Sequence, residues 1–321
     1  MEIVVLDGYT LNPGDLSWDS MKKLGNVTVH GRTPTDPETV LKTIGNASII
    51  FTNKTPIPKE VIDNAPSLKY IGVLATGYNV VDITAAINKG ITVTNVPAYS
   101  TTSVAQMTMA LLLEMCHNTG LHSNAVHDGE WTKNGNFSFW KTPLIELAGK
   151  TFGIIGFGAI GQATAKLAQA FGMQIITYSR TKKPVLETAN CKFVSLDVLL
   201  EESDFISLHC PLLPETEGII NTKNISKMKD GVKIINTSRG QLVNEEDLKI
   251  ALQNGNVSGA ALDVISEEPM LSTNPLLEVK NCIITPHIAW APKESRARLL
   301  QTATHNLEAY LNNKPINVIK G

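Results

Sequence analysis

The chain has 321 residues, of which 43% are hydrophobic and 18% are charged. This composition is typical of a globular protein. At about 150 residues per domain, the length predicts two domains and argues against a disordered chain. The net charge of −2 offers no basic surface to a polyanion, so we expect no nucleic-acid partner. No run of about 18 apolar residues is present, so we expect no membrane span.

The N-terminus and the cysteines predict a cytoplasmic protein. The opening M-E-I-V-V-L-D-G lacks a basic region followed by a long apolar stretch, so it predicts a strand and not a signal peptide. Cysteines occur only at Cys116, Cys191, Cys210 and Cys282, and none belongs to a C-x-x-C pair. Their spacing suits neither a disulfide scaffold, a zinc knuckle nor a redox dithiol. We therefore expect reduced thiols and no metal site.

Short β-rich runs alternate with helical patterns over the first hundred residues. The expected strands are 3–6, 27–30, 48–52, 69–74 and 92–96, and the expected helices are 16–24, 37–44, 58–64 and 81–89. Strands separated by helices of this length are typical of βαβ units with a mostly parallel sheet.

A long helix is expected next, at 102–117, after the capping sequence S-T-T-S. Apolar residues occupy nearly all of its faces, which predicts deep burial. Glycine and asparagine break the pattern at 127–143, so we expect a long loop there.

A second alternating series begins at residue 150. The expected strands are 151–156, 174–179, 205–209, 233–236, 259–264 and 282–285, and the expected helices are 160–171, 224–228, 245–253 and 294–312. The sequence therefore predicts an α/β protein with two modules of parallel sheet.

The strongest local motif is G-F-G-A-I-G, which lies between a predicted strand and a predicted helix. Gly156 permits a tight turn, Gly158 lets the backbone approach a pyrophosphate, and Gly161 lets helix and strand pack closely. Ala159 and Ile160 open the helix, whose free N–H groups favour an anion. The motif predicts a dinucleotide site; the alternative is a glycine-rich turn without a ligand.

The following strand indicates which dinucleotide is preferred. An acidic residue at its end holds the adenosine ribose in NAD enzymes, but here the strand ends at Ser179 and continues with Arg180 and Thr181. An arginine and two hydroxyls suit a ribose phosphate, which favours NADP over NAD. The alternative is a solvated basic turn that holds either ribose loosely.

Four reactive side chains follow the last predicted strands. Arg239 is the next-to-last residue of I-I-N-T-S-R-G, Asp263 ends G-A-A-L-D, Glu268 follows in S-E-E-P, and His287 ends C-I-I-T-P-H. Ligand groups of open α/β sheets lie at the carboxyl ends of strands, so we expect these residues at one edge. Taken singly, Arg239 suits a structural ion pair, Glu268 a turn and Asp263 a cap.

These stretches resemble the D-isomer-specific 2-hydroxyacid dehydrogenase family over almost the whole chain. Within it, the F-S-F-W segment and the tryptophan after His287 are similar to bacterial glycerate dehydrogenases, also called hydroxypyruvate reductases. The resemblance implies a smaller flavodoxin-like substrate domain formed by residues 1–98 and 290–321. It also implies an NAD(P)-binding Rossmann domain at 99–289, which carries a dimerisation helix and loop.

The resemblance further implies NAD(P)H-dependent reduction of hydroxypyruvate or glyoxylate, with Arg239, Glu268 and His287 as the catalytic set. Protonated His287 would deliver a proton to the developing alkoxide, Glu268 would orient its ring, and Arg239 would pair with the substrate carboxylate. The alternatives are reduction of another 2-keto acid, or a non-enzymatic corepressor that senses the dinucleotide.

The resemblance also implies a wider set of binding residues. The cofactor would contact the glycine motif together with Ser179, Arg180, Thr181, Cys210, Pro211, Thr216, Thr237, Ser238 and Asp263. The substrate would contact Ala75, Thr76, Gly77, Arg239, His287 and Trp290.

A homodimer is expected because one module cannot easily cover the apolar helix 102–117 and the aromatic residues after it. These are Trp131, Phe137, Phe139 and Trp140. Trp140 would then reach the substrate site of a second copy. The alternative is that the aromatic side chains fold back onto their own domain.

Overall fold

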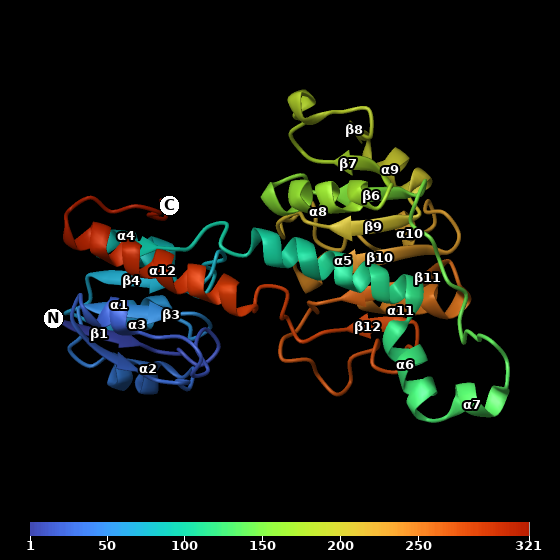
Figure 1. The fold of residues 1–321 in the computed structure, drawn as a ribbon. Coiled ribbons are helices and arrows are strands. Elements are labelled where there is room, and N and C mark those ends of the chain that lie inside the picture. The colour runs from blue at the N-terminus through green and yellow to red at the C-terminus, as the bar shows by residue number, and fades with distance from the viewer. Residues whose placement is uncertain (321) are drawn as a thin grey trace. The chain divides into compact units, whose positions relative to one another are not determined.

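The computed structural model describes residues 1–320, which form two compact units (Figure 1). The smaller unit comprises Met1–Ser100 and the stretch from Trp290 on, and the larger unit is Thr101–Ala289. Each contains one sheet, and every paired strand runs parallel to its neighbours. The prediction of two doubly wound α/β domains is confirmed.

The sheet of the smaller unit has the order β2-β1-β3-β4-β5, which is the flavodoxin-like order. Its strands are β1 (Glu2–Val5), β2 (Asn26–Val29), β3 (Ile49–Thr52), β4 (Tyr70–Val73) and β5 (Thr92–Thr94). Its helices are α1 (Asp19–Lys22), α2 (Pro37–Ile44), α3 (Lys59–Asn64), α4 (Ile83–Asn88) and α12 (Lys293–Leu311).

Alternate residues of these strands enter two apolar layers, as the period of a strand requires. On one face, Ile3 and Val5 pack with Leu299 and Leu307 of α12. On the other face, Val4 packs with residues of α2, α3 and α4. The last segment of the chain therefore completes the core of the first domain.

The sheet of the larger unit has the order β12-β11-β10-β9-β6-β7-β8. Its strands are β6 (Thr151–Ile155), β7 (Gln174–Tyr178), β8 (Cys191–Phe193), β9 (Phe205–Leu208), β10 (Val232–Asn236), β11 (Val257–Leu262) and β12 (Cys282–Ile284). The chain starts at β6, runs outward through β7 and β8, and returns to β9 on the other side of β6. This reversal is the topological switch point of a Rossmann fold, where ligands bind at the carboxyl ends of the strands.

Helices cover both faces of the larger sheet. α5 (Thr101–His117) and α8 (Ala159–Ala170) pack on one face, and α9 (Leu196–Glu202), α10 (Thr222–Ile225) and α11 (Glu245–Asn254) pack on the other. The remaining elements are α6 (Thr119–His127), α7 (Glu130–Asn134) and the short 3-10 helices Pro184–Leu186 and Gly240–Leu242. No helix within residues 1–320 is both long and apolar enough to cross a membrane.

Several predicted elements are wrong in extent. The helix expected at 16–24 is only α1, because the Asn12 side chain bonds to the backbone of Gly14 and Leu16 and forms a turn before it. The loop expected at 127–143 contains α7, whose ends are capped by Gly129 and Gly135 at φ values of +79° and +70°. The two glycines lie at the two ends of α7, so they limit its length without preventing the helix from forming.

Other elements were not predicted at all, or lie elsewhere. β8 has only three residues, too few for a recognisable alternation, and α9 follows a capping bond from Val198 N–H to the Ser195 side chain. α10 begins two residues before the expected helix at 224–228. The expected burial of α5 on nearly every face is also wrong, because Gln106 and Ala110 are exposed.

Candidate active site

The glycine motif forms the turn between β6 and α8. Gly156 has a φ of +98°, and a Cβ there would lie 2.5 Å from the backbone nitrogen of Cys210. A Cβ on Gly161 would lie 2.3 Å from the carbonyl oxygen of Gly156, so the helix packs closely on its own turn. A Cβ on Gly158 would meet nothing within 4 Å. The open space beside Gly158 and the N-terminus of α8 fits a pyrophosphate.

The end of β7 carries the residues expected at the ribose. Ser179 is half-buried directly after the strand, and Arg180 and Thr181 are exposed. The stretch continues with two exposed lysines, and no carboxylate occurs from residue 178 to 183.

The end of β9 forms the other side of the switch point. Burial lowers the pKa of His209 to about 4, so this imidazole is neutral at pH 7, and its Nε2 lies 2.9 Å from the Ser207 hydroxyl. Burial raises the pKa of Cys210 to about 11, so its thiol stays protonated. The Thr216 hydroxyl donates to the carbonyl of Pro211 at 2.7 Å and fixes the following loop.

A tight turn after β10 presents Arg239. Buried Asn236 donates to the Arg239 carbonyl at 2.7 Å and accepts from the Ser238 N–H at 3.0 Å. The Ser238 hydroxyl donates to the Cys210 carbonyl at 2.7 Å, and the Thr237 hydroxyl lies 3.1 Å from that of Thr108 on α5. These bonds join the turn to β9 and to α5.

The Arg239 side chain itself is exposed. Its guanidinium donates to the Ser238 carbonyl at 2.7 Å, and it forms no ion pair with any residue of the described chain, 1–320. A guanidinium has five N–H donors, so most of them remain available to a carboxylate.

The loop carrying Glu268 packs directly on the Arg239 turn. A Cβ on Gly240 would lie 1.8 Å from the carbonyl carbon of Ile265, so only glycine fits there. The Glu245 carboxylate accepts from Ser266 N–H at 2.7 Å and from the Asn274 amide at 2.8 Å. Glu245 thus holds the loop at both ends.

Glu268 and His287 form the central pair of the site. The Nδ1 of His287 lies 2.7 Å from Oε2 of Glu268. Their side chains are 29% and 33% exposed, so the pair is accessible without being fully solvated. Because Glu268 binds Nδ1, the Nε2 of His287 is left to face a substrate.

Asp263 anchors the turn that bears His287. Its buried carboxylate accepts from the Thr285 hydroxyl at 2.6 Å, from Ile288 N–H at 2.9 Å and from Ala289 N–H at 2.8 Å. His287 has a φ of +54°, a conformation that is uncommon for a residue with a side chain. The capping alternative for Asp263 thus has a geometric basis, and its contact with a cofactor stays a prediction.

The remaining residues predicted to contact the substrate belong to the smaller unit. The segment 75–77 follows β4, where Val96 N–H donates to the Ala75 carbonyl and the Thr76 hydroxyl donates to the Val96 carbonyl. The backbone N–H groups of residues 75–77 donate no hydrogen bond to any residue from 1 to 320. Trp290 packs edge-on against Tyr99, with ring centroids 6.5 Å apart.

Sequence reasoning missed three residues that shape the site: Asn236, Gly240 and Glu245. Glu245 begins a helix that was predicted, but the residues that favour a helix start do not indicate a hydrogen bond to a loop 21 residues later. No group of three or more His, Cys, Asp or Glu side chains within the described chain could hold a metal ion.

Comparison with known proteins identifies relatives of the whole chain. The family model "D-isomer specific 2-hydroxyacid dehydrogenase, NAD binding domain" matches residues 109–289. A hydroxypyruvate reductase of Blautia hydrogenotrophica is 58% identical over 320 residues, which cover 99% of each chain. A glyoxylate reductase of Thermococcus litoralis is 42% identical, covering 82% of this chain and 80% of the relative.

A solved structure extends the comparison to the fold. An acyclic imino acid reductase in complex with NADPH and D-Arg superimposes with a TM-score of 0.84 at 31% identity and covers 100% of both chains.

Proposed function

The chain belongs to the D-isomer-specific 2-hydroxyacid dehydrogenase family, and on this premise we propose that it reduces hydroxypyruvate to D-glycerate and glyoxylate to glycolate. The family makes it an oxidoreductase that uses a nicotinamide dinucleotide. The substrates are proposed because the relatives of 58% and 42% identity carry the names hydroxypyruvate reductase and glyoxylate reductase.

The observation that carries the proposal is the Glu268–His287 pair, together with exposed Arg239 on the turn that packs against the loop of Glu268. The 2.7 Å contact holds the imidazole ring by Nδ1, which leaves Nε2 in position to exchange a proton with a substrate oxygen. Arg239, free of an ion pair in the described chain, can bind a carboxylate through two N–H groups.

The proposed reaction follows from these residue types. A reduced nicotinamide, when bound, would supply a hydride to the carbonyl carbon, and negative charge would develop on the carbonyl oxygen. His287 gives its proton to that oxygen, and Arg239 holds the substrate carboxylate and stabilises the developing charge. In the reverse direction His287 accepts the hydroxyl proton, and Glu268 holds the ring in place throughout.

We propose that the cofactor lies along the switch point, with its pyrophosphate beside Gly158. Cys210, Pro211, Thr216, Thr237 and Ser238 surround the same strand ends and complete the proposed contacts. We also propose a preference for NADP over NAD, supported by Arg180 and by the absence of a carboxylate at 178–183.

We propose that the free N–H groups of Ala75, Thr76 and Gly77 bind the substrate carboxylate. Successive N–H groups of a loop make a concave site for anions, and the glycine allows a close approach. Trp290 would contribute an apolar contact to the substrate.

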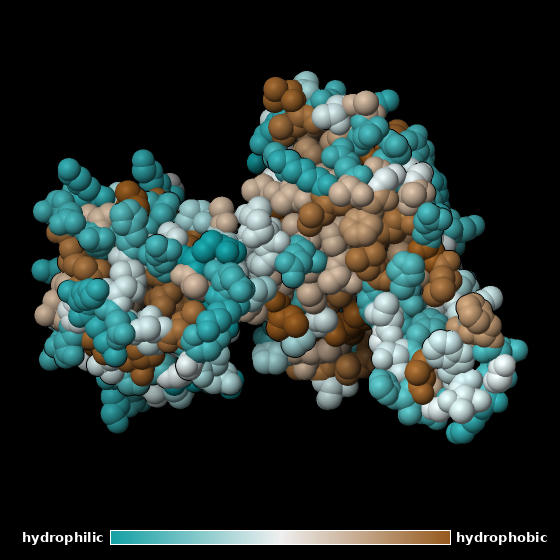
Figure 2. Space-filling view, viewed as in Figure 1, coloured by the Kyte–Doolittle hydropathy of each residue, from teal (hydrophilic) through white to brown (hydrophobic). Residues whose placement is uncertain are grey.

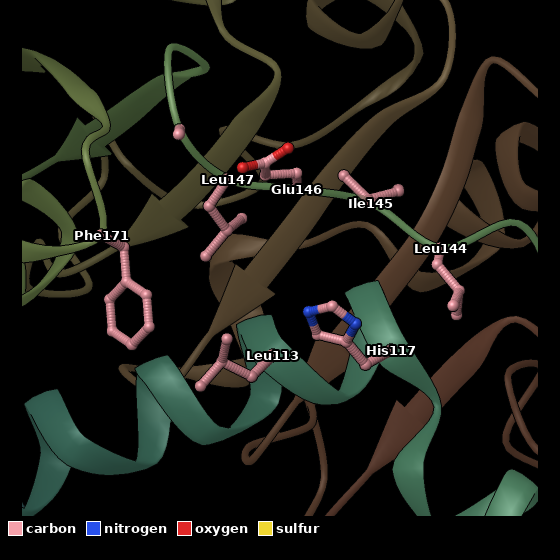
Figure 3. A pocket seen from close by; sticks show the side chains of 8 residues that line it. Leu113, His117, Leu144, Ile145, Glu146, Leu147 and Phe171 are labelled. Atoms are coloured by element: carbon pink, nitrogen blue, oxygen red, sulfur yellow. The ribbon is translucent and has the colours of Figure 1, made fainter.

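A homodimer is the proposed assembly, supported by the apolar surface of the larger unit. Phe137 is 96% and Trp140 is 66% exposed, so these rings do not fold back onto their own domain. Figure 2 shows apolar surface over α5 and α8. A groove of about 530 Å³ lies there, and Leu113, Leu147 and Phe171 line it in Figure 3. A second copy would cover this surface, and its Trp140 would reach the substrate site.

A cytoplasmic location is also proposed, supported by four free cysteines.

The test is a panel of 2-keto acids assayed with NADH and with NADPH by following cofactor oxidation. We expect the highest kcat/KM with hydroxypyruvate and glyoxylate. A higher kcat/KM with another 2-keto acid would favour the first alternative, and tight cofactor binding without turnover would favour a corepressor. Sedimentation at micromolar concentration tests the dimer, which a clean monomer of 34.8 kDa would contradict.

A further inference from the structure

A buried lysine lies at the edge of the larger sheet opposite the active site. Lys233 is the second residue of β10, only 9% exposed, and pairs in register with Gly259 of β11. A Cβ on Gly259 would lie 3.1 Å from the Lys233 Nζ, so the missing side chain makes room for the ammonium group. Strand interiors normally bury apolar side chains, so this charge requires an explanation.

The structure offers Lys233 no partner. Its Nζ makes no hydrogen bond and no ion pair with any residue from 1 to 320. The nearby Cys116 is fully buried, and burial raises the pKa of its thiol to about 11, so it carries no compensating charge. Burial also lowers the pKa of Lys233, as expected for an ammonium group without a counter-charge. The Nζ atom is not among the fully buried unpaired side-chain atoms of the described residues, so it reaches solvent at the cavity. An anion bound there would pair with this ammonium group.

A cavity of about 140 Å³ opens beside this lysine. Its walls come from the starts of β9 and β10 and from the segment before β6, and they include Lys150, Asp204, Lys229, Asp230 and Lys233. Roughly 10–15 Å³ suffices for one water molecule, so the cavity has room for an ion of several heavy atoms.

The charges around the cavity do not cancel. Asp204 forms an ion pair with Lys229 at 3.1 Å, and it also accepts a hydrogen bond from Thr151 N–H at 2.8 Å. Asp230 accepts from an asparagine amide. Lys150, like Lys233, has no acidic partner within the described chain. The lining has three lysines and two aspartates, so one positive charge is left over after Lys229 is paired with Asp204.

We propose that this cavity binds a small oxyanion of the size of inorganic phosphate, with Lys233 and Lys150 as its cationic ligands. Lysine binds phosphate as a point charge, and a site at the amino ends of the strands is separate from the catalytic edge. The bound anion would stabilise the larger unit without touching the reacting groups.

The test measures thermal unfolding and calorimetric binding with sodium phosphate, against sodium chloride at matched ionic strength and pH. Because phosphate can also occupy the glycine turn at α8, each titration is run with saturating cofactor. The variants are Lys233→Met, which keeps the shape of the side chain, and Lys150→Gln. Lys192→Gln, at an exposed position of β8, is the matched control.

We expect phosphate to raise the melting temperature of the parent more than chloride does. Lys233→Met should weaken phosphate binding at least about ten-fold, and Lys150→Gln by a smaller factor, since each removes a charged partner. Lys192→Gln should bind as the parent does. Without phosphate, Lys233→Met should melt at or above the parent temperature, because an ammonium group without an ion pair, on a residue only 9% exposed, is replaced by an apolar group.

Two results would overturn the site. One is the absence of any phosphate effect beyond that of chloride. The other is unchanged phosphate binding in Lys233→Met or, if that variant does not fold, in Lys150→Gln. Turnover should be the same in all three variants as in the parent, so this test does not depend on which substrate is reduced.

Discussion

The anchor beneath the proposed proton donor can be tested by Asp263→Asn. The carboxylate accepts three hydrogen bonds at 2.6–2.9 Å, two of them from the backbone directly after His287. An asparagine oxygen can keep the bonds to Thr285 and Ile288. Its NH₂ group would then face the Ala289 N–H, and both donors would be buried without an acceptor.

The magnitude follows from these contacts. An unsatisfied buried donor together with the loss of charge assistance costs about 3 kcal/mol of unfolding free energy. For a domain of this size we expect the melting temperature to fall by roughly 6–12 °C. We also expect kcat to fall at least about ten-fold, because a released turn no longer holds His287 at Glu268.

The assay pairs thermal unfolding with steady-state kinetics and a cofactor titration by fluorescence. Asp128→Asn, at an exposed helix end, is the matched control and should leave all three measurements unchanged. If Asp263 acts by anchoring, the cofactor Kd stays near the parent value. A parent-like melting temperature with a weakened cofactor Kd would refute the anchor and favour the contact with the nicotinamide.

Four further changes test the site and its surroundings. His287→Asn should lower kcat by about 100-fold or more, because general acid catalysis is lost, while calorimetry should show unchanged cofactor binding. Ser179→Asp should shift kcat/KM toward NADH, since a carboxylate repels a ribose phosphate and accepts from ribose hydroxyls. Glu245→Gln should lower kcat several-fold and make the loop at Ser266 more sensitive to proteolysis, because two charge-assisted bonds are lost. His209→Gln should flatten the loss of stability between pH 6.5 and 4: the native imidazole resists protonation until about pH 4, whereas the unfolded one protonates near 6.5 and draws the equilibrium toward unfolding.

Each of these expectations has a clear contrary result. Parent-like turnover of His287→Asn would remove the histidine from the mechanism. A parent enzyme that already prefers NADH strongly would contradict the role given to Arg180. An unchanged digestion pattern in Glu245→Gln would show that Ser266 is held by other contacts. An acid unfolding curve for His209→Gln that overlays the parent curve would show that its burial does not govern acid stability.

The sequence predicts best what depends on neighbouring residues. The glycine motif could be recognised because its three glycines and their spacing lie within six residues, between a strand and a helix. The strands that precede Arg239, Asp263 and His287 were found for the same reason: each is a short, mostly apolar run followed by polar residues.

What the sequence could not predict depends on contacts between distant segments. Only glycine fits at position 240 because the backbone of Ile265 lies so close, and Glu245 accepts a hydrogen bond from the N–H of Ser266. The sequence around Gly240 and Glu245 predicts neither contact. The helix α7 was missed because glycines at both ends were interpreted as breaking it. The family resemblance implied that Glu268 orients the His287 ring, and the structure adds the 2.7 Å distance and the loop between β11 and β12 that brings the two side chains together.

The Asp263 anchor also has a mechanical consequence for the path of the chain. The larger unit ends at Ala289, only two residues after His287, and the chain then enters the other unit. Without this anchor, a displacement of the backbone after Ala289 would shift the imidazole of His287 through two peptide bonds. Because the Asp263 carboxylate accepts hydrogen bonds from the N–H groups of both Ile288 and Ala289, it fixes the backbone where the chain leaves the larger unit. We therefore expect movements of the segment after Ala289 to have little effect on the position of His287, the proposed proton donor.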